Sequence, residues 1–144
     1  MYRDYYTRRM RFSQGGIFLH TYLAITPKAL SQLPAPPPLP LVHMAYAVGQ
    51  GGCLTRCAAA NLPHGGLMGL SDRCSGSIPR ADALCRAIAA ECVRRGFQGV
   101  LADFESPAHT DRLSFLTQLT GQLSAHGLAL FSPLTLPAKG AALL

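Results

Sequence analysis

The chain has 144 residues, a formal net charge of +6 and a hydrophobic content of 49%, which is enough to form a buried core. No apolar run approaches the roughly 20 residues needed to span a bilayer, so we expect no membrane-spanning helix. The basic start is not followed by the uninterrupted apolar stretch of a signal peptide, and the sequence therefore gives no indication of export.

Much of the positive charge lies near the N-terminus, where Arg3, Arg8, Arg9 and Arg11 occur among tyrosines. Such a segment can bind nucleic acid or anionic surfaces, but a short solvated tail is the more frequent explanation. No aromatic-basic RNA motif accompanies it. We therefore interpret residues 1–15 as a basic tail that precedes a domain over residues 16–144, and we expect no nucleic-acid partner.

The first half of this domain predicts strands that alternate with a short helix. Residues 16–23 predict a strand, and Thr26 followed by Pro27 caps a helix that extends through residue 33. Residues 42–48 are the second predicted strand and residues 66–71 the third. The proline-rich segment between the helix and the second strand can resemble an SH3 ligand, but we expect it to be an extended connector.

The next segment predicts a helix. Ser77 is a candidate N-cap, Pro79 falls in the first turn, and Gly96 ends the helix. The apolar residues follow helical spacing. They are Ala81, Leu84, Cys85, Ile88, Ala89 and Cys92.

The last part of the chain continues the alternation. Residues 96–105 predict a buried strand, and Thr110 with Asp111 begins another helix that stops at Gly127. Residues 128–136 predict a further strand. This order of helices and strands favours parallel βα units, in which the strand over residues 96–105 is the fourth.

Two carboxylates end that fourth strand. Because strand side chains alternate between faces, Leu101, Asp103 and Glu105 point to one face and the intervening residues to the other. Each charge of a carboxylate pair raises the proton affinity of the other, so one member can stay protonated near neutrality and protonate a leaving group. Alternatively, both acids are solvated or cap the next helix.

The same segment resembles the strand-4 signature of family 18 glycoside hydrolases, the chitinase-like barrels. That pattern is Asp-Gly-x-Asp-x-Asp-x-Glu after an aromatic residue. The matching positions are Phe97, Gly99, Asp103 and Glu105. Gln98 stands where the family has its first Asp, and Leu101 stands where it has the inner Asp. The resemblance implies that Glu105 protonates the glycosidic oxygen and that Asp103 orients the substrate's N-acetyl group, which acts as the nucleophile.

Further candidate substrate-binding residues follow from the rule that barrel sites form at the carboxyl ends of strands. They are Tyr22, Tyr46, Ser71 and Asp72. Tyr46 lies in a Met-Ala-Tyr-Ala segment similar to the aromatic-Ala end of the family's second strand, although an aromatic residue here can equally fill the core. Ser71 and Asp72 depart from the Ser-x-Gly-Gly with which the family ends its third strand.

The fold that this resemblance implies is α/β, a partial (β/α)8 TIM-type barrel with about five parallel strands. A complete barrel takes about 250 residues, so we expect the chain to be truncated before closure. The family's Trp of the last strand and Tyr of the sixth strand have no counterpart in the sequence. Unpaired edge strands would lead to poor solubility or to a homo-oligomer.

The predicted function is a glycosidase that acts on N-acetylglucosamine-containing polysaccharide, peptidoglycan or chitin, by substrate-assisted retaining hydrolysis. One alternative is an inactive or truncated remnant that binds carbohydrate as a lectin-like domain. Another is a basic protein-interaction or nucleic-acid module, whose binding would weaken with salt.

No cofactor or metal is expected. Cys53, Cys57, Cys74 and His64 lack the paired second half of a zinc motif. An odd number of cysteines fits a reducing compartment, and we expect a cytoplasmic location for the chain as given.

Overall fold

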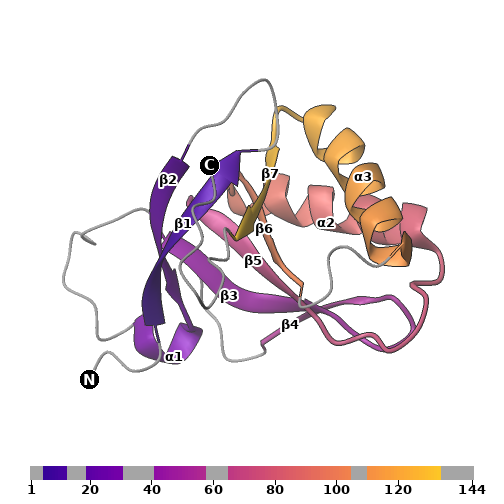
Figure 1. The fold of residues 1–144 in the computed structure, drawn as a ribbon, viewed down its shortest axis with the longest axis horizontal. Helices are drawn as coiled ribbons and strands as arrows, with labels where there is room; N and C mark the ends of the chain where they lie inside the picture. Colours follow the sequence, from indigo (N-terminus) through magenta and orange to yellow (C-terminus); the bar gives the residue numbers. More distant parts are fainter. Residues whose placement is uncertain (1–4, 13–18, 31–40, 58–64, 105–109, 134–144) are drawn as a thin grey trace, which may run out of the picture.

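A computed structural model of the chain describes residues 5–12, 19–30, 41–57, 65–104 and 110–133. In the second half of the chain its strands and helices alternate (Figure 1). In order they are β1 (Tyr5–Phe12), β2 (Leu19–Ile25), α1 (Pro27–Leu30), β3 (Leu41–Val48), β4 (Leu54–Arg56), β5 (Leu67–Asp72), α2 (Ala81–Arg95), β6 (Gly99–Asp103), α3 (Thr110–Ser124) and β7 (Ala129–Pro133).

The strands form one mixed sheet in which parallel pairs predominate. Its order is β2-β1-β7-β6-β5-β3-β4, with an additional pairing between β2 and β3. Four pairs are parallel: β2 with β3, β3 with β5, β5 with β6, and β6 with β7. The antiparallel pairs are β1 with β2, β1 with β7, and β3 with β4. The α/β class and the run of parallel strands were predicted from the sequence, and β6 is the fourth strand of that run.

Each strand divides its side chains between two faces of the sheet. Helices α2 and α3 lie side by side over one of them, which we call the helix face (Figure 1). On β6, Val100, Ala102 and Phe104 pack into the core cluster that contains the helix side chains. Leu101 instead belongs to a separate cluster on the opposite face, the second face. The alternation expected for this strand is therefore confirmed over its described residues.

The second face is lined by apolar residues. Val42, Leu67, Leu101 and Phe131 are buried there, one from each of four neighbouring strands. Met44 packs against them. A side chain at Gly69 would collide with the Met44 sulfur, so the absence of a Cβ at Gly69 gives this methionine its room.

Two helix caps lie where the sequence predicts them. The hydroxyl oxygen of Thr26 accepts a hydrogen bond from the backbone N–H of Ala29 at 3.2 Å, which confirms the predicted N-cap of α1. Gly96 ends α2 with a φ of 71°, as expected of a C-cap glycine. Both caps satisfy backbone groups that a helix end leaves without an intrahelical partner.

The start of α2 differs from the prediction. The helix begins at Ala81, and the N-cap is Arg80 rather than Ser77. The segment before it is held in place by tertiary contacts, because Ile78 is buried and its backbone N–H donates to Asp111 on α3. Arg80 has a φ of 49°, and no side-chain hydrogen bond caps the helix.

Two strands were not predicted. Residues 5–12, expected to belong to a basic tail, form β1, which pairs with both β2 and β7. The short strand β4 follows a turn in which the backbone N–H of Gly49 donates to the carbonyl of Cys53 at 2.8 Å. The three residues of β4 are too few to show a period. In β1, the arginines at positions 8, 9 and 11 conceal the strand pattern.

Replacing Arg80 by glycine should stabilise the protein. The left-handed conformation costs a non-glycine residue about 1–2 kcal/mol, while glycine loses up to about 1 kcal/mol through the greater freedom of the unfolded chain. We therefore expect Arg80→Gly to raise the free energy of unfolding by about 0.5–1 kcal/mol, measured by urea denaturation. A lower value than that of the parent protein would show that the arginine side chain contributes more stability than its backbone strain costs.

Candidate functional site

Asp103 and Ser71 lie next to each other at the carboxyl ends of adjacent strands. The parallel pairing of β5 with β6 places Ser71 opposite Asp103 without an irregularity in register. Ser71 lies four residues after Leu67, and Asp103 two residues after Leu101, so both belong to the second face. Each is partly buried. The structure thus brings together two of the residues that the sequence proposed for one site.

Two further candidates lie wholly or partly outside the described residues. Glu105, the predicted proton donor, belongs to the segment 105–109, which the structure does not describe. The backbone of Tyr22 pairs with Arg8 in the antiparallel β1–β2 ladder. Its side chain is not described, so its position relative to Asp103 stays a prediction.

Tyr46 lies on the helix face and not beside Asp103. The pairing of β3 with β5 shifts register between His43 and Tyr46, which changes the alternation of the residues that follow. Tyr46 is buried in the helix-side core, and its hydroxyl donates to Glu91 Oε2 on α2 at 2.6 Å. Its ring also meets Phe97 edge-on. The geometry matches the alternative in which this tyrosine fills the core.

Glu91 is the acceptor in a small charged cluster. Arg94 donates to Glu91 Oε1 from two nitrogens, and Arg95 Nε lies 3.5 Å from Oε2. Burial alone would raise the pKa of Glu91, but the hydrogen bonds from Tyr46 and Arg94 outweigh it and hold this pKa below its ordinary value of 4.5. Burial and the hydrogen bond to Glu91 raise the pKa of Tyr46, which keeps its hydroxyl protonated as a donor.

Glu91 should make the stability of the protein depend on pH. Because its folded-state pKa is lowered, Glu91 contributes stability above its unfolded-state value and loses that contribution as the pH falls through the folded-state value. Between about pH 5 and pH 3, the free energy of unfolding should therefore fall less in Glu91→Gln than in the parent protein. Urea denaturation across this range measures the two slopes, and equal slopes would contradict the assignment.

Asp72 also faces the helices, where it binds a buried arginine. Arg112, in the first turn of α3, is only 7% exposed. Its Nε donates to Asp72 Oδ2 at 2.5 Å, and its other nitrogens donate to Asp111 Oδ2 and to the carbonyl of Cys74, both at 2.6 Å. Asp72 Oδ1 accepts a hydrogen bond from the backbone N–H of Cys74 at 3.1 Å. Asp72 is therefore separated from Asp103 by the sheet and ties β5 to α3.

Sequence reasoning did not identify Arg112. One signal was available, because an arginine at the start of a helix is disfavoured by the helix dipole unless a carboxylate accompanies it. Asp111 precedes Arg112 in the sequence, but Asp72 is 40 residues away from it. The hydrogen bond that Asp72 accepts keeps the pKa of Arg112 raised, so this guanidinium is always charged.

Replacing Arg112 by methionine should destabilise the protein strongly. The change keeps most of the buried volume and leaves two partly buried carboxylates without their partner, at a cost of about 2–3 kcal/mol. Arg86, exposed on α2, offers a matched control, since Arg86→Met should stay within about 0.5 kcal/mol of the parent protein. Urea denaturation tests both variants. Equal small effects would show that the Arg112 cluster contributes no net stability.

The described part of the chain contains no group of three or more His, Cys, Asp and Glu residues placed to hold a metal ion. None of the helices in the described ranges is both long enough and apolar enough to cross a membrane.

Comparisons of the chain with protein-family models, with curated proteins and with solved structures found no match.

Proposed function

We propose that this chain is a glycoside hydrolase-like domain that acts on N-acetylglucosamine-containing polysaccharide by substrate-assisted retaining hydrolysis. One observation carries the proposal. Asp103 lies at the carboxyl end of the fourth strand in the parallel series, on the face away from α2 and α3, with Ser71 beside it. In βα barrels the catalytic residues occupy the carboxyl ends of the strands.

The proposed chemistry divides the work between two acids and the substrate. Glu105 gives its proton to the glycosidic oxygen as the bond to the anomeric carbon breaks. Asp103 orients the acetamido group so that its carbonyl oxygen attacks the same carbon from the opposite side. Water then attacks the anomeric carbon of this cyclic intermediate and gives a proton to Glu105. Because this is the second attack on that carbon, the original anomeric configuration is restored. Ser71 supplies a hydroxyl to the sugar beside Asp103.

We also propose that the sheet forms a small barrel. The pairings run from β3 through β5, β6, β7 and β1 to β2, and β2 pairs again with β3. In this arrangement β1 lies between β2 and β7 and joins the two ends of the parallel series. A barrel of this kind leaves fewer unpaired edges than the truncated one expected from the sequence.

A lectin-like domain is the second candidate function. Leu101 replaces the inner acid of the family pattern and is buried in the apolar layer of the second face. Tyr46 and Asp72 are engaged by α2 and α3 rather than by the Asp103 site. These positions favour a site with fewer catalytic groups, which would bind a glycan without hydrolysing it.

The release of reducing ends from N-acetylglucosamine oligomers and from peptidoglycan tests the function. Glu105→Gln should lower turnover by about 100-fold or more, because general acid catalysis typically contributes at least that much, and should leave binding largely intact. Asp103→Asn should also lower turnover. Asp82→Asn is the matched control, because Asp82 is exposed on α2 and its replacement keeps the oxygen that accepts a hydrogen bond from Gln118.

The same assay distinguishes the two candidates. Unchanged turnover in Glu105→Gln would reject the assigned proton donor. Saturable binding of the oligomer without any turnover in the parent protein, weakened by Asp103→Asn, would establish the lectin-like alternative. Absence of both binding and turnover would reject the carbohydrate proposal.

A further inference from the structure

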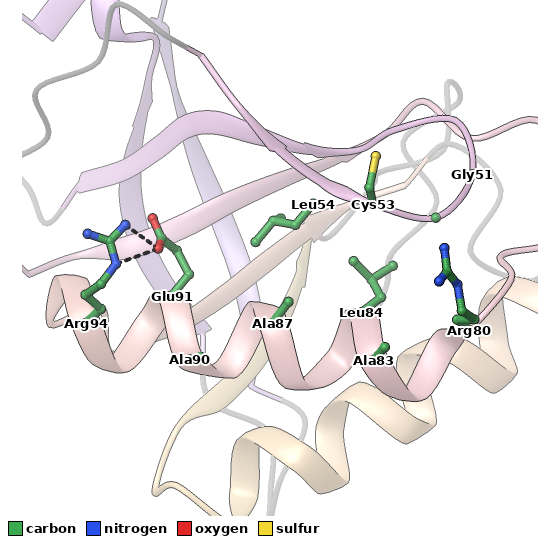
Figure 2. Close-up of a pocket in the computed structure, with 11 residues that line it drawn as sticks. Gly51, Cys53, Leu54, Arg80, Ala83, Leu84, Ala87, Ala90, Glu91 and Arg94 are labelled. Carbon is green, nitrogen blue, oxygen red and sulfur yellow. Dashed lines mark hydrogen bonds and ion pairs between the residues drawn. The ribbon is translucent and has the colours of Figure 1, made fainter.

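A groove of about 570 Å³ lies between α2 and the turn that joins β3 to β4. Figure 2 shows Arg80 at one end of the groove, the Glu91–Arg94 pair at the other, and Ala83 and Ala87 along the helix between them. The lining comprises Gly51, Gly52, Cys53, Leu54, Arg80, Ala83, Leu84, Ala87, Ala90, Glu91 and Arg94. The groove therefore has a floor of small apolar side chains and an arginine at each end.

The backbone of Arg80, at one end of the groove, is strained. It adopts the left-handed conformation, and within the described ranges it is the sole non-glycine residue with a positive φ. Gly52 packs so closely against this segment that a Cβ there would approach the Pro79 carbonyl oxygen to 2.7 Å. The Arg80 guanidinium is exposed and makes no hydrogen bond or ion pair with any residue that the structure describes. Strain that no internal contact offsets is typical of a binding residue.

At the other end of the groove, Arg94 has N–H groups that can still bind an anion. Glu91 is already engaged by Tyr46, Arg94 and Arg95, so its charge is compensated. The side chain of Arg94 is 63% exposed, and only its Nε and one terminal nitrogen donate to Glu91. A guanidinium has five N–H donors, which leaves others for a second carboxylate.

The length and chemistry of the groove define its occupant. Arg80 and Arg94 are separated by fourteen residues, or about 21 Å along a helix axis. An extended peptide covers that distance in about six or seven residues. The lining contains no aromatic residue on which a nucleic-acid base would stack. From this complementarity we infer that the groove binds an extended peptide segment of a protein partner, with a carboxylate at each end of a short run of small apolar residues.

This inference does not depend on the proposed glycosidase activity. A fluorescein-labelled peptide of about eight residues, with aspartate at both ends and alanine and leucine between them, reproduces the required spacing when extended. Fluorescence anisotropy should detect its binding to the full chain. Replacing both aspartates with asparagine should weaken binding about tenfold or more, because each charge-assisted hydrogen bond typically contributes at least that factor.

Variants of the groove separate binding from stability. Arg80→Gly should weaken binding about tenfold, although we expect this variant to be more stable than the parent protein. Arg80→Lys should retain most of the affinity because it keeps the charge, and Ala87→Glu should abolish binding by placing an acid on the floor. Arg86→Gln, on the exposed surface of α2 but outside the groove, should leave binding unchanged.

Several results would overturn the inference. They are the absence of measurable binding at millimolar peptide, equal affinity of the aspartate and asparagine peptides, and unchanged affinity in Arg80→Gly. A single-stranded oligonucleotide that displaces the peptide and depends on Arg80 would assign the groove to nucleic acid instead.

Discussion

Each side chain of β6 points to one of the two faces of the sheet, and this constraint decides which residues can form a site. The helix face takes Val100, Ala102 and Phe104 into the main core, whereas Leu101 enters the apolar layer of the second face. Asp103 follows Leu101 by two residues and therefore stands on the second face, where α2 and α3 do not cover it. The regular register between β5 and β6 then brings Ser71 beside it. A shift of one residue in either strand would separate this pair.

Polar side chains have different roles on the two faces of the sheet. On the helix face, polar side chains connect elements: Tyr46 joins β3 to α2 through Glu91, and Asp72 joins β5 to α3 through Arg112. These bonds hold the helices against the sheet, so neither residue is available to a ligand beside Asp103. On the second face, an apolar layer supports the polar pair formed by Ser71 and Asp103. The candidate site therefore depends on a framework in which Tyr46 and Asp72 are already bound to α2 and α3.

Much of the fold could be predicted from local patterns. The alternation of β6, the Thr26 cap and the Gly96 stop each depend on a few neighbouring residues, so the sequence shows them directly. The proximity of Asp103 and Ser71 could be predicted, because strand position and alternation determine it. The structure places Tyr46 and Asp72 on the helix face instead. A register shift in β3 reverses the face of Tyr46, and Arg112, 40 residues from Asp72, engages that carboxylate. The register shift leaves no local signal, and an arginine at the start of α3 does not show which distant carboxylate it binds.

Both candidate functions require that Asp103 and Ser71 form one sugar-binding surface on the second face. A titration of the isotope-labelled chain with an N-acetylglucosamine oligomer, followed by amide chemical shifts in NMR spectra, tests this most directly. The largest shifts should occur at the carboxyl ends of β5 and β6, with little change along the exposed side of α2. Shifts confined to α2, or no shifts at saturating oligomer, would contradict this requirement.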